Sequence, residues 1–203
     1  SSLIVGLSSN NLGKISAGIL SSTLVFVALI FSSIILFNIY KHEDQILYEN
    51  FYNWISISSL EIGIGYLIDK FSAVMLFVVL LISFVVHVYS ISYMSEEKDF
   101  KRFFSYIALF TFSMILLVMS NNLIQLFIGW EGVGLVSYLL IGFFYKKESA
   151  IKANLKAFLI NRIGDMFFIL GIAMIYALFD SFDYRTIFIN INKVDFENLD
   201  SYF

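Results

Sequence analysis

The sequence predicts an all-α fold: a polytopic membrane helix bundle with five full transmembrane helices, a truncated first helix and a short β-hairpin in an outer-face loop. Of the 203 residues, 59% are hydrophobic and 14% are charged, whereas an ordinary soluble domain has about 45–50% apolar and about 25% charged residues. Several apolar runs reach the roughly 20 residues that a helix needs to cross a bilayer. Polar clusters separate these runs, which is typical of a multi-pass membrane protein.

Five runs are long enough to span. They are residues 15–40, 71–94, 103–119, 123–145 and 153–179. Residues 1–7 are apolar but too short, so we interpret them as the end of a truncated helix. Residues 1–179 are therefore predicted to form one transmembrane bundle, followed by a polar, mostly acidic outer-face tail at 180–203.

The outer-face loop at 45–69 follows a different period. Apolar residues occupy alternate positions there, at Ile55, Ile57, Leu60, Ile62, Ile64 and Tyr66. A period of two indicates β-strands, here a hairpin that turns near Ser58 and Ser59. Asp69 directly precedes the next span and is predicted to cap that helix.

Basic residues are distributed unequally between alternate loops. One side of the membrane receives Lys14, Lys98, Lys101, Arg102, Lys146, Lys147 and Lys152, and the other receives only Lys41, Lys70, Arg185 and Lys193. Short cytoplasmic loops carry the excess of lysine and arginine. The hairpin and the tail are therefore predicted on the outer face, with the basic loops in the cytosol or matrix.

Composition also excludes several classes of protein. A net charge of −3 without a basic stripe excludes nucleic acid as a partner. The chain has no cysteine, so thiolate sites are impossible, and its two histidines, His42 and His87, are too far apart to predict a metal site. No cofactor-binding residues are predicted. Abundant Phe and Tyr with no proline favour an AT-rich, organelle-encoded gene.

Glu131 lies near the middle of the span at 123–145, within the sequence GWEGVG. A charge at the bilayer centre is costly, so it normally faces protein or water and marks an ion or proton path. The neighbouring glycines let helices approach closely or leave room for water. The alternative is a packing motif whose acid is held in a buried ion pair, and that acid would also need a partner.

Arg162 and Asp165 form a second candidate constellation. They are three residues apart, so they share one helix face near the centre of the last span. Alone, the pair fits a local salt bridge equally well. Together with Glu131 on the preceding helix, it resembles a proton relay. His87 could also pass protons, although a neutral histidine bonded to a neighbouring helix is the favoured alternative. Lys156 lies on the same span as Arg162, deeper than a typical snorkelling lysine.

Three blocks of sequence carry a resemblance to a known family. They are VVHVYSISYMS at 85–95, the segment 103–145 with its WEGVG motif, and the segment 150–172 with its NRIGD motif. At this mutual spacing, the chain resembles chain 5 of NADH:ubiquinone oxidoreductase, the antiporter-like membrane subunit of respiratory complex I.

The resemblance implies a proton-translocating subunit that contributes half of a proton channel, coupled to NADH oxidation and quinone reduction elsewhere in the complex. By position, Glu131 matches the family's channel glutamate, and Arg162 and Asp165 match the charged pair on the next helix. His87 and Lys156 also match residues of the family pattern. The chain would then be part of a translocase without a redox site of its own. A cation/proton antiporter subunit without redox partners and a purely structural scaffold are the alternatives.

The resemblance also implies partners and a location. NADH, FMN, iron–sulfur clusters and ubiquinone are expected in other subunits, and other membrane subunits of complex I are expected neighbours. Family members are much longer, so a separate chain or a missing segment is expected to supply the channel lysines and the lateral helix. The expected location is the mitochondrial inner membrane, with the bacterial plasma membrane as the alternative.

Overall fold

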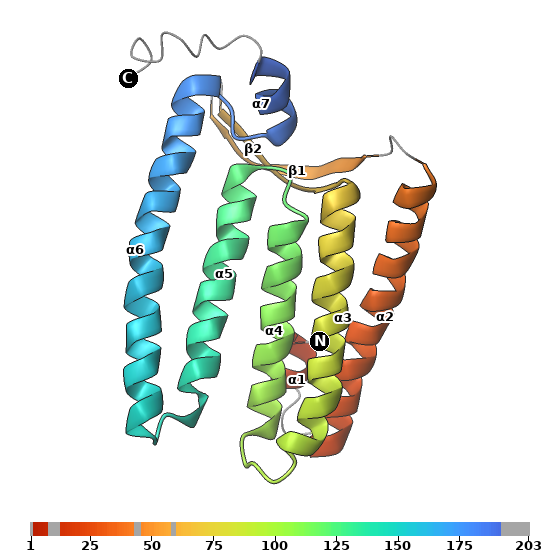
Figure 1. The fold of residues 1–203 in the computed structure, drawn as a ribbon, viewed down its shortest axis with the longest axis vertical. Helices are drawn as coiled ribbons and strands as arrows, with labels where there is room; N and C mark the ends of the chain where they lie inside the picture. Colours follow the sequence, from red (N-terminus) through yellow and green to blue (C-terminus); the bar gives the residue numbers. More distant parts are fainter. Residues whose placement is uncertain (1, 8–12, 43–45, 58–59, 192–203) are drawn as a thin grey trace.

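The computed structural model describes residues 2–7, 13–42, 46–57 and 60–191. In this part of the chain, five long helices stand side by side and a two-stranded hairpin lies across one end of the bundle (Figure 1). The long helices are α2 (Lys14–Lys41), α3 (Lys70–Tyr93), α4 (Phe100–Val118), α5 (Leu123–Ile141) and α6 (Glu148–Phe179). The shorter elements are α1 (Ser2–Leu7), β1 (Leu47–Ile57), β2 (Leu60–Ile68), the 3-10 helix η1 (Gly142–Phe144) and α7 (Tyr184–Asn190).

All five predicted spans are confirmed as helices that are long and apolar enough to cross a membrane. The largest difference is in α6, which begins at Glu148 rather than at residue 153. This first turn is polar, and it carries a Glu148–Lys152 ion pair of 3.8 Å, a spacing that stabilises helices. The predicted outer-face tail also contains regular structure, because α7 lies within it; residues 192–203 of that tail lie outside the described residues.

The predicted hairpin is confirmed as well. Strands β1 and β2 pair antiparallel from Leu47↔Ile68 to Ile57↔Leu60, with register irregularities after Asn50 and after Asn53. The predicted turn at 58–59 lies outside the described residues. The predicted cap is present, because the Asp69 carboxylate accepts a hydrogen bond of 2.7 Å from the Ser72 N–H.

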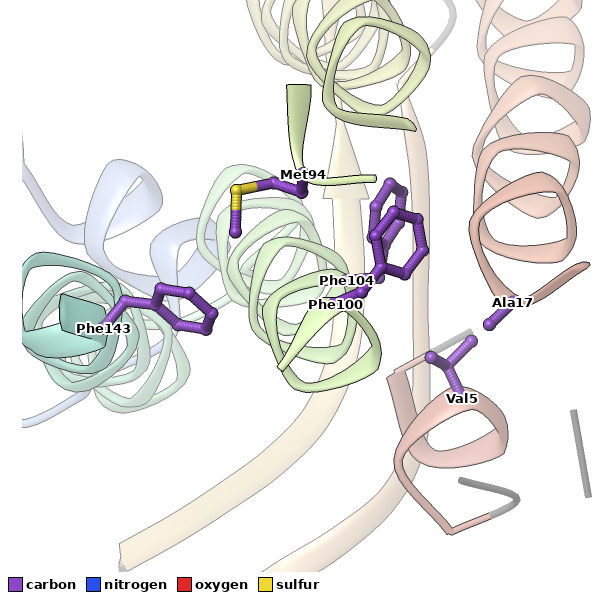
Figure 2. Close-up of a cluster of buried hydrophobic side chains, with 6 residues drawn as sticks. All are labelled: Val5, Ala17, Met94, Phe100, Phe104 and Phe143. Atoms are coloured by element: carbon purple, nitrogen blue, oxygen red, sulfur yellow. The ribbon is translucent and has the colours of Figure 1, made fainter. Parts of the chain in front are cut away.

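A buried apolar cluster joins the helices away from the hairpin. Its members are Val5, Ala17, Met94, Phe100, Phe104 and Phe143. Figure 2 shows the Phe100 and Phe104 rings at its centre, where their centroids are 4.6 Å apart, with Ala17 and Val5 approaching from α2 and α1. The cluster therefore packs together segments that lie far apart in the sequence, from Val5 to Phe143.

The two ends of the bundle differ in charge. We call the end that carries β1 and β2 the hairpin end, and the opposite end the basic end. At the basic end, Lys14 Nζ donates to the Glu97 carbonyl oxygen at 2.9 Å, and the loop of Lys98 lines a cavity with Lys146 and Lys147. The three loops predicted to share one side of the membrane therefore lie at the same end.

Candidate functional site

Glu131, Arg162 and Asp165 meet between α5 and α6. Arg162 Nη1 donates to Glu131 Oε1 at 2.7 Å and to Oε2 at 2.5 Å. The same nitrogen lies 3.6 Å from Asp165 Oδ2, and the Phe158 ring lies under the guanidinium, 5.1 Å from Cζ. Arg162 is thus bound more closely to the acid on the neighbouring helix than to the acid on its own helix.

Trp130 completes this group. Its indole Nε1–H donates to Asp165 Oδ1 at 2.9 Å, while its ring packs edge-on against Phe168. The sequence does not predict this hydrogen bond, because no sequence pattern distinguishes a tryptophan that donates to a buried acid from one that packs at the membrane interface. We call Trp130, Glu131, Arg162 and Asp165 the acid–base cluster.

The acid–base cluster is buried unevenly. The exposed fraction of the side chain is 11% for Asp165, 26% for Glu131 and 45% for Arg162. Asp165 is therefore closed off between the helices, whereas the guanidinium reaches the outer surface of the helix pair. A cation at this depth normally faces protein or water rather than lipid.

The glycines beside Glu131 serve the contact between α4 and α5. A Cβ on Gly129 would lie 2.7 Å from the Leu117 backbone nitrogen, and one on Gly132 would lie 2.8 Å from Ser113 Oγ. Around Gly134, by contrast, a Cβ would meet no atom within 4 Å among the described residues. Close packing of α5 on α4 therefore turns Glu131 toward α6, where its partner is.

His87 and Lys156 lie apart from the acid–base cluster. His87 is fully buried in α3, and its Nδ1 bonds the Ser83 carbonyl oxygen of its own helix at 2.8 Å. Lys156 is exposed on α6, and no ion pair within the described ranges joins it to Glu131 or Asp165. Across those ranges, no group of three or more His, Asp or Glu residues is arranged to hold a metal ion.

A second polar group fastens α5 to the hairpin. Gln125 Nε2 donates to the Gly65 carbonyl oxygen at 2.9 Å, and Gln125 Oε1 accepts from the Gly65 N–H at 3.1 Å. Asn122 caps α5 through the Gln125 N–H and also donates to the Gly63 carbonyl oxygen at 2.7 Å. We call these four residues the hairpin clamp. A polar glutamine inside an apolar run indicates a buried hydrogen-bond partner, but it does not indicate that this partner is the hairpin.

The segment after α6 is bonded to α5 and β1 at the hairpin end. The Leu123 N–H donates to the Phe182 carbonyl oxygen at 3.0 Å, and the Tyr48 hydroxyl donates to Asp183 Oδ2 at 2.9 Å. Burial, together with this hydrogen bond, raises the pKa of the Tyr48 hydroxyl above its ordinary value of 10.0. The N-terminus of α5 and the C-terminus of α6 are thus held together, which supports the register of the acid–base cluster between them.

The acid–base cluster brings two carboxylates to one guanidinium. A buried ionisable group inside a membrane span is typical of proton relays.

Family models match most of the described chain. The family described as NADH-ubiquinone oxidoreductase (complex I), chain 5 N-terminus, matches residues 54–104. The family described as NADH:quinone oxidoreductase/Mrp antiporter, transmembrane, matches residues 120–202. The second match contains the whole acid–base cluster.

Curated relatives are similar over nearly the whole chain. NADH-quinone oxidoreductase subunit L of Neisseria meningitidis serogroup A is 48% identical over 195 residues, which cover 95% of this chain and 29% of that protein. NADH-ubiquinone oxidoreductase chain 5 of Marchantia polymorpha is 42% identical over 177 residues, which cover 87% of this chain and 26% of that protein. The chain thus spans under a third of the length of these relatives.

Solved structures share the fold. A chain of the membrane-bound sulfane sulfur reductase, an archaeal respiratory membrane complex, matches 96% of this chain and 38% of its own length, with a TM-score of 0.80 and 17% identity. A chain of the Mrp complex from Dietzia sp. DQ12-45-1b matches with a TM-score of 0.77 and 19% identity, covering 96% of this chain and 20% of that one. The family models and the curated relatives show that the chain belongs to the antiporter-like membrane subunits that include NADH-quinone oxidoreductase subunit L and NADH-ubiquinone oxidoreductase chain 5, and that it corresponds to their N-terminal portion.

Proposed function

We propose that the chain forms the N-terminal part of a proton-translocating subunit of respiratory complex I, and that the acid–base cluster is its share of a proton channel. The observation that carries this proposal is the position of Glu131 at mid-span, bonded to Arg162 on the adjacent helix. The names of the similar proteins, NADH-quinone oxidoreductase subunit L and NADH-ubiquinone oxidoreductase chain 5, support it. NADH oxidation and quinone reduction would take place in other subunits.

In the proposed mechanism, Glu131 alternates between its ionised and protonated forms. A nearby cation favours the ionised carboxylate, whereas desolvation favours the protonated one. When a second cation, supplied by the part of the subunit beyond this chain, approaches Glu131, Glu131 releases a proton. When that cation withdraws, Glu131 takes up a proton.

Asp165 would respond to the protonation of Glu131. Arg162 Nη1 lies closer to Glu131 than to Asp165, so protonation of Glu131 frees the guanidinium to shift toward Asp165. Opening the ion pair between Arg162 and Glu131 therefore strengthens the ion pair between Arg162 and Asp165. This is a two-state coupling between neighbouring sites. Lys156 and His87 lie outside this step, and their proposed part would be in proton transfer toward or away from the cluster.

The proposed partners are the other membrane subunits of complex I, and a separate chain or further segment that carries the channel lysines and the lateral helix. Relatives from Neisseria and Marchantia are named as subunits or chains of larger assemblies. The proposed location is the mitochondrial inner membrane, with the bacterial plasma membrane as the alternative.

Replacement of Glu131 by Gln in the assembled complex tests the channel role. We expect NADH oxidation to continue, with fewer protons moved per NADH or with slower coupled turnover, because an amide cannot ionise. The measurement is the ratio of protons moved to NADH oxidised in sealed vesicles. Glu148→Gln is the matched control, since Glu148 is an exposed acid that pairs only weakly with Lys152. An unchanged ratio and rate in Glu131→Gln would refute the proposal.

A subunit of a cation/proton antiporter without redox partners is the second candidate. The family that matches residues 120–202 includes Mrp antiporters in its description. Purification of the intact assembly distinguishes the two candidates: iron–sulfur and flavin-containing subunits support complex I, whereas an assembly of membrane subunits alone supports the antiporter.

A further inference from the structure

Several buried side-chain polar atoms have no hydrogen-bond partner among the described residues. Two of them are His87 Nε2 on α3 and Ser21 Oγ on α2, and both residues have an exposed fraction of 0%. Buried polar atoms in native proteins are almost always bonded to protein or to ordered water. These two atoms therefore indicate a shared partner if they lie close together.

The hydrogen bonds of His87 determine which atom it offers. Its Nδ1 bonds the Ser83 carbonyl oxygen at 2.8 Å, and a carbonyl can only accept, so Nδ1 carries the hydrogen. In the neutral ring, Nε2 is then an acceptor with a free lone pair. A suitable partner for Nε2 must donate a hydrogen bond.

Contacts one turn away place Ser21 at the level of His87. A Cβ on Gly18 of α2 would lie 3.2 Å from Ile91 of α3 and 3.1 Å from Phe100 of α4. One helical turn further, α2 presents Ser21 on the same buried face, α3 presents His87, and α4 presents Phe104.

Further contacts confirm this register. The rings of His87 and Phe104 are 6.0 Å apart, and the rings of Phe26 and Phe84 are 5.0 Å apart. Both pairs continue the alignment set by Gly18. The serine hydroxyl and the imidazole thus belong to one layer of the three-helix packing.

We propose that His87 Nε2 and Ser21 Oγ bind one buried water molecule between α2 and α3. A water molecule can donate to the imidazole nitrogen and bond the serine hydroxyl at the same time. Two polar partners are within the two to four that buried waters normally have. This site is distinct from the acid–base cluster, and the proposal does not depend on the proposed function.

The water would complete a polar ladder across three helices. Ser83 Oγ lies 2.5 Å from Thr111 Oγ1 and 3.3 Å from His87 Nδ1, so α4 is already joined to α3. The water extends this ladder to α2. A cavity of about 500 Å³, lined mostly by apolar residues and by Thr111, adjoins its α4 end.

High-resolution density of the assembled native complex tests the site directly. We expect an ordered water within hydrogen-bond distance of both His87 Nε2 and Ser21 Oγ. A dry interface at these two atoms would overturn the proposal, and so would a direct contact between them. Because this measurement concerns neither NADH oxidation nor proton movement, it is independent of the Glu131→Gln experiment.

A double-mutant cycle with Ser21→Ala and His87→Leu provides a second test. If one water joins the two residues, each substitution alone lowers the thermal unfolding temperature of the complex, and the Ser21→Ala effect largely disappears in the His87→Leu background. Ser32→Ala is the matched control, because Ser32 Oγ is also buried without a described partner but lies three turns further along α2. Its effect should be the same in both backgrounds. Additive effects of Ser21→Ala and His87→Leu would count against the shared water.

Discussion

A single nitrogen of Arg162 connects the two acids of the acid–base cluster. Both Glu131 oxygens and one Asp165 oxygen lie within 4 Å of Nη1, while Trp130 holds the other Asp165 oxygen. Asp165 therefore has a hydrogen bond from a neutral donor, the indole, in addition to its contact with the guanidinium.

Replacement of Trp130 by Phe should impair this arrangement without dismantling it. Phenylalanine keeps a ring near Phe168 but removes the Nε1–H, and a hydrogen bond to a charged group contributes roughly 1.5–3 kcal/mol. We expect the variant complex to assemble and to move fewer protons per NADH, measured in sealed vesicles. Trp54→Phe, on the exposed face of β1, is the control. Equal proton-to-NADH ratios for both variants would contradict a role for the indole.

The sequence predicts the three charged residues of the cluster, Glu131, Arg162 and Asp165, because charges in an apolar run are visible in it. It also groups His87 and Lys156 with them, and it does not show how the charged residues pair. The distance between two helices is not visible there, and the closer partner of Arg162 is Glu131 rather than the Asp165 of its own turn. The distance between His87 and the cluster is likewise not visible in the sequence, because it depends on how the helices pack.

At the scale of elements, the hairpin clamp fixes the start of α5. Gln125 bonds both backbone groups of Gly65 in the way that a neighbouring strand would. A Cβ on Gly65 would overlap the Glu49 carbonyl oxygen and the Asn121 side chain, so glycine is needed for this close approach. The alternating pattern predicted the strands, but nothing local in the sequence predicted that a glutamine some sixty residues later would bond them.

Replacement of Gln125 by Leu should loosen the hairpin from the bundle. It leaves the buried Gly65 N–H and carbonyl groups without their partner, at a cost of about 1–3 kcal/mol for each group. We expect a lower unfolding temperature of the assembled complex and faster proteolysis within the hairpin. Tyr66→Phe serves as the control, because it removes only an exposed hydrogen bond to Glu49. Equal stability of the two variants would show that the clamp does not hold the hairpin.

At the scale of the whole molecule, the distribution of loops between the two ends of the bundle indicates how the chain is oriented in the membrane. The predicted side of each loop rests on the excess of lysine and arginine, and the structure places the three basic loops at one end. Sequence periodicity and charge were sufficient here, because span length and loop charge follow directly from the bilayer. The docking of α7 beside the hairpin could not be predicted in this way, since it depends on contacts such as that between Tyr48 and Asp183.

Site-directed labelling can test this topology in a chain that has no native cysteine. Lys98→Cys lies at the basic end, and Glu61→Cys lies in β2; both positions are exposed. We expect a membrane-impermeant maleimide to label Lys98→Cys only from the cytosolic or matrix side, and Glu61→Cys only from the opposite side. Labelling of both from one side would contradict the predicted orientation.

The composition of the acid–base cluster has an electrical consequence. Two carboxylates with one guanidinium leave it one negative charge in excess whenever both acids are ionised. It becomes neutral by binding one proton or by meeting one further cation. Moving one elementary charge across 100 mV corresponds to about 2.3 kcal/mol, and a group at mid-span senses part of that drop. Under the proposed function, the number of protons bound by the cluster should therefore respond to the membrane voltage as well as to the pH on either side.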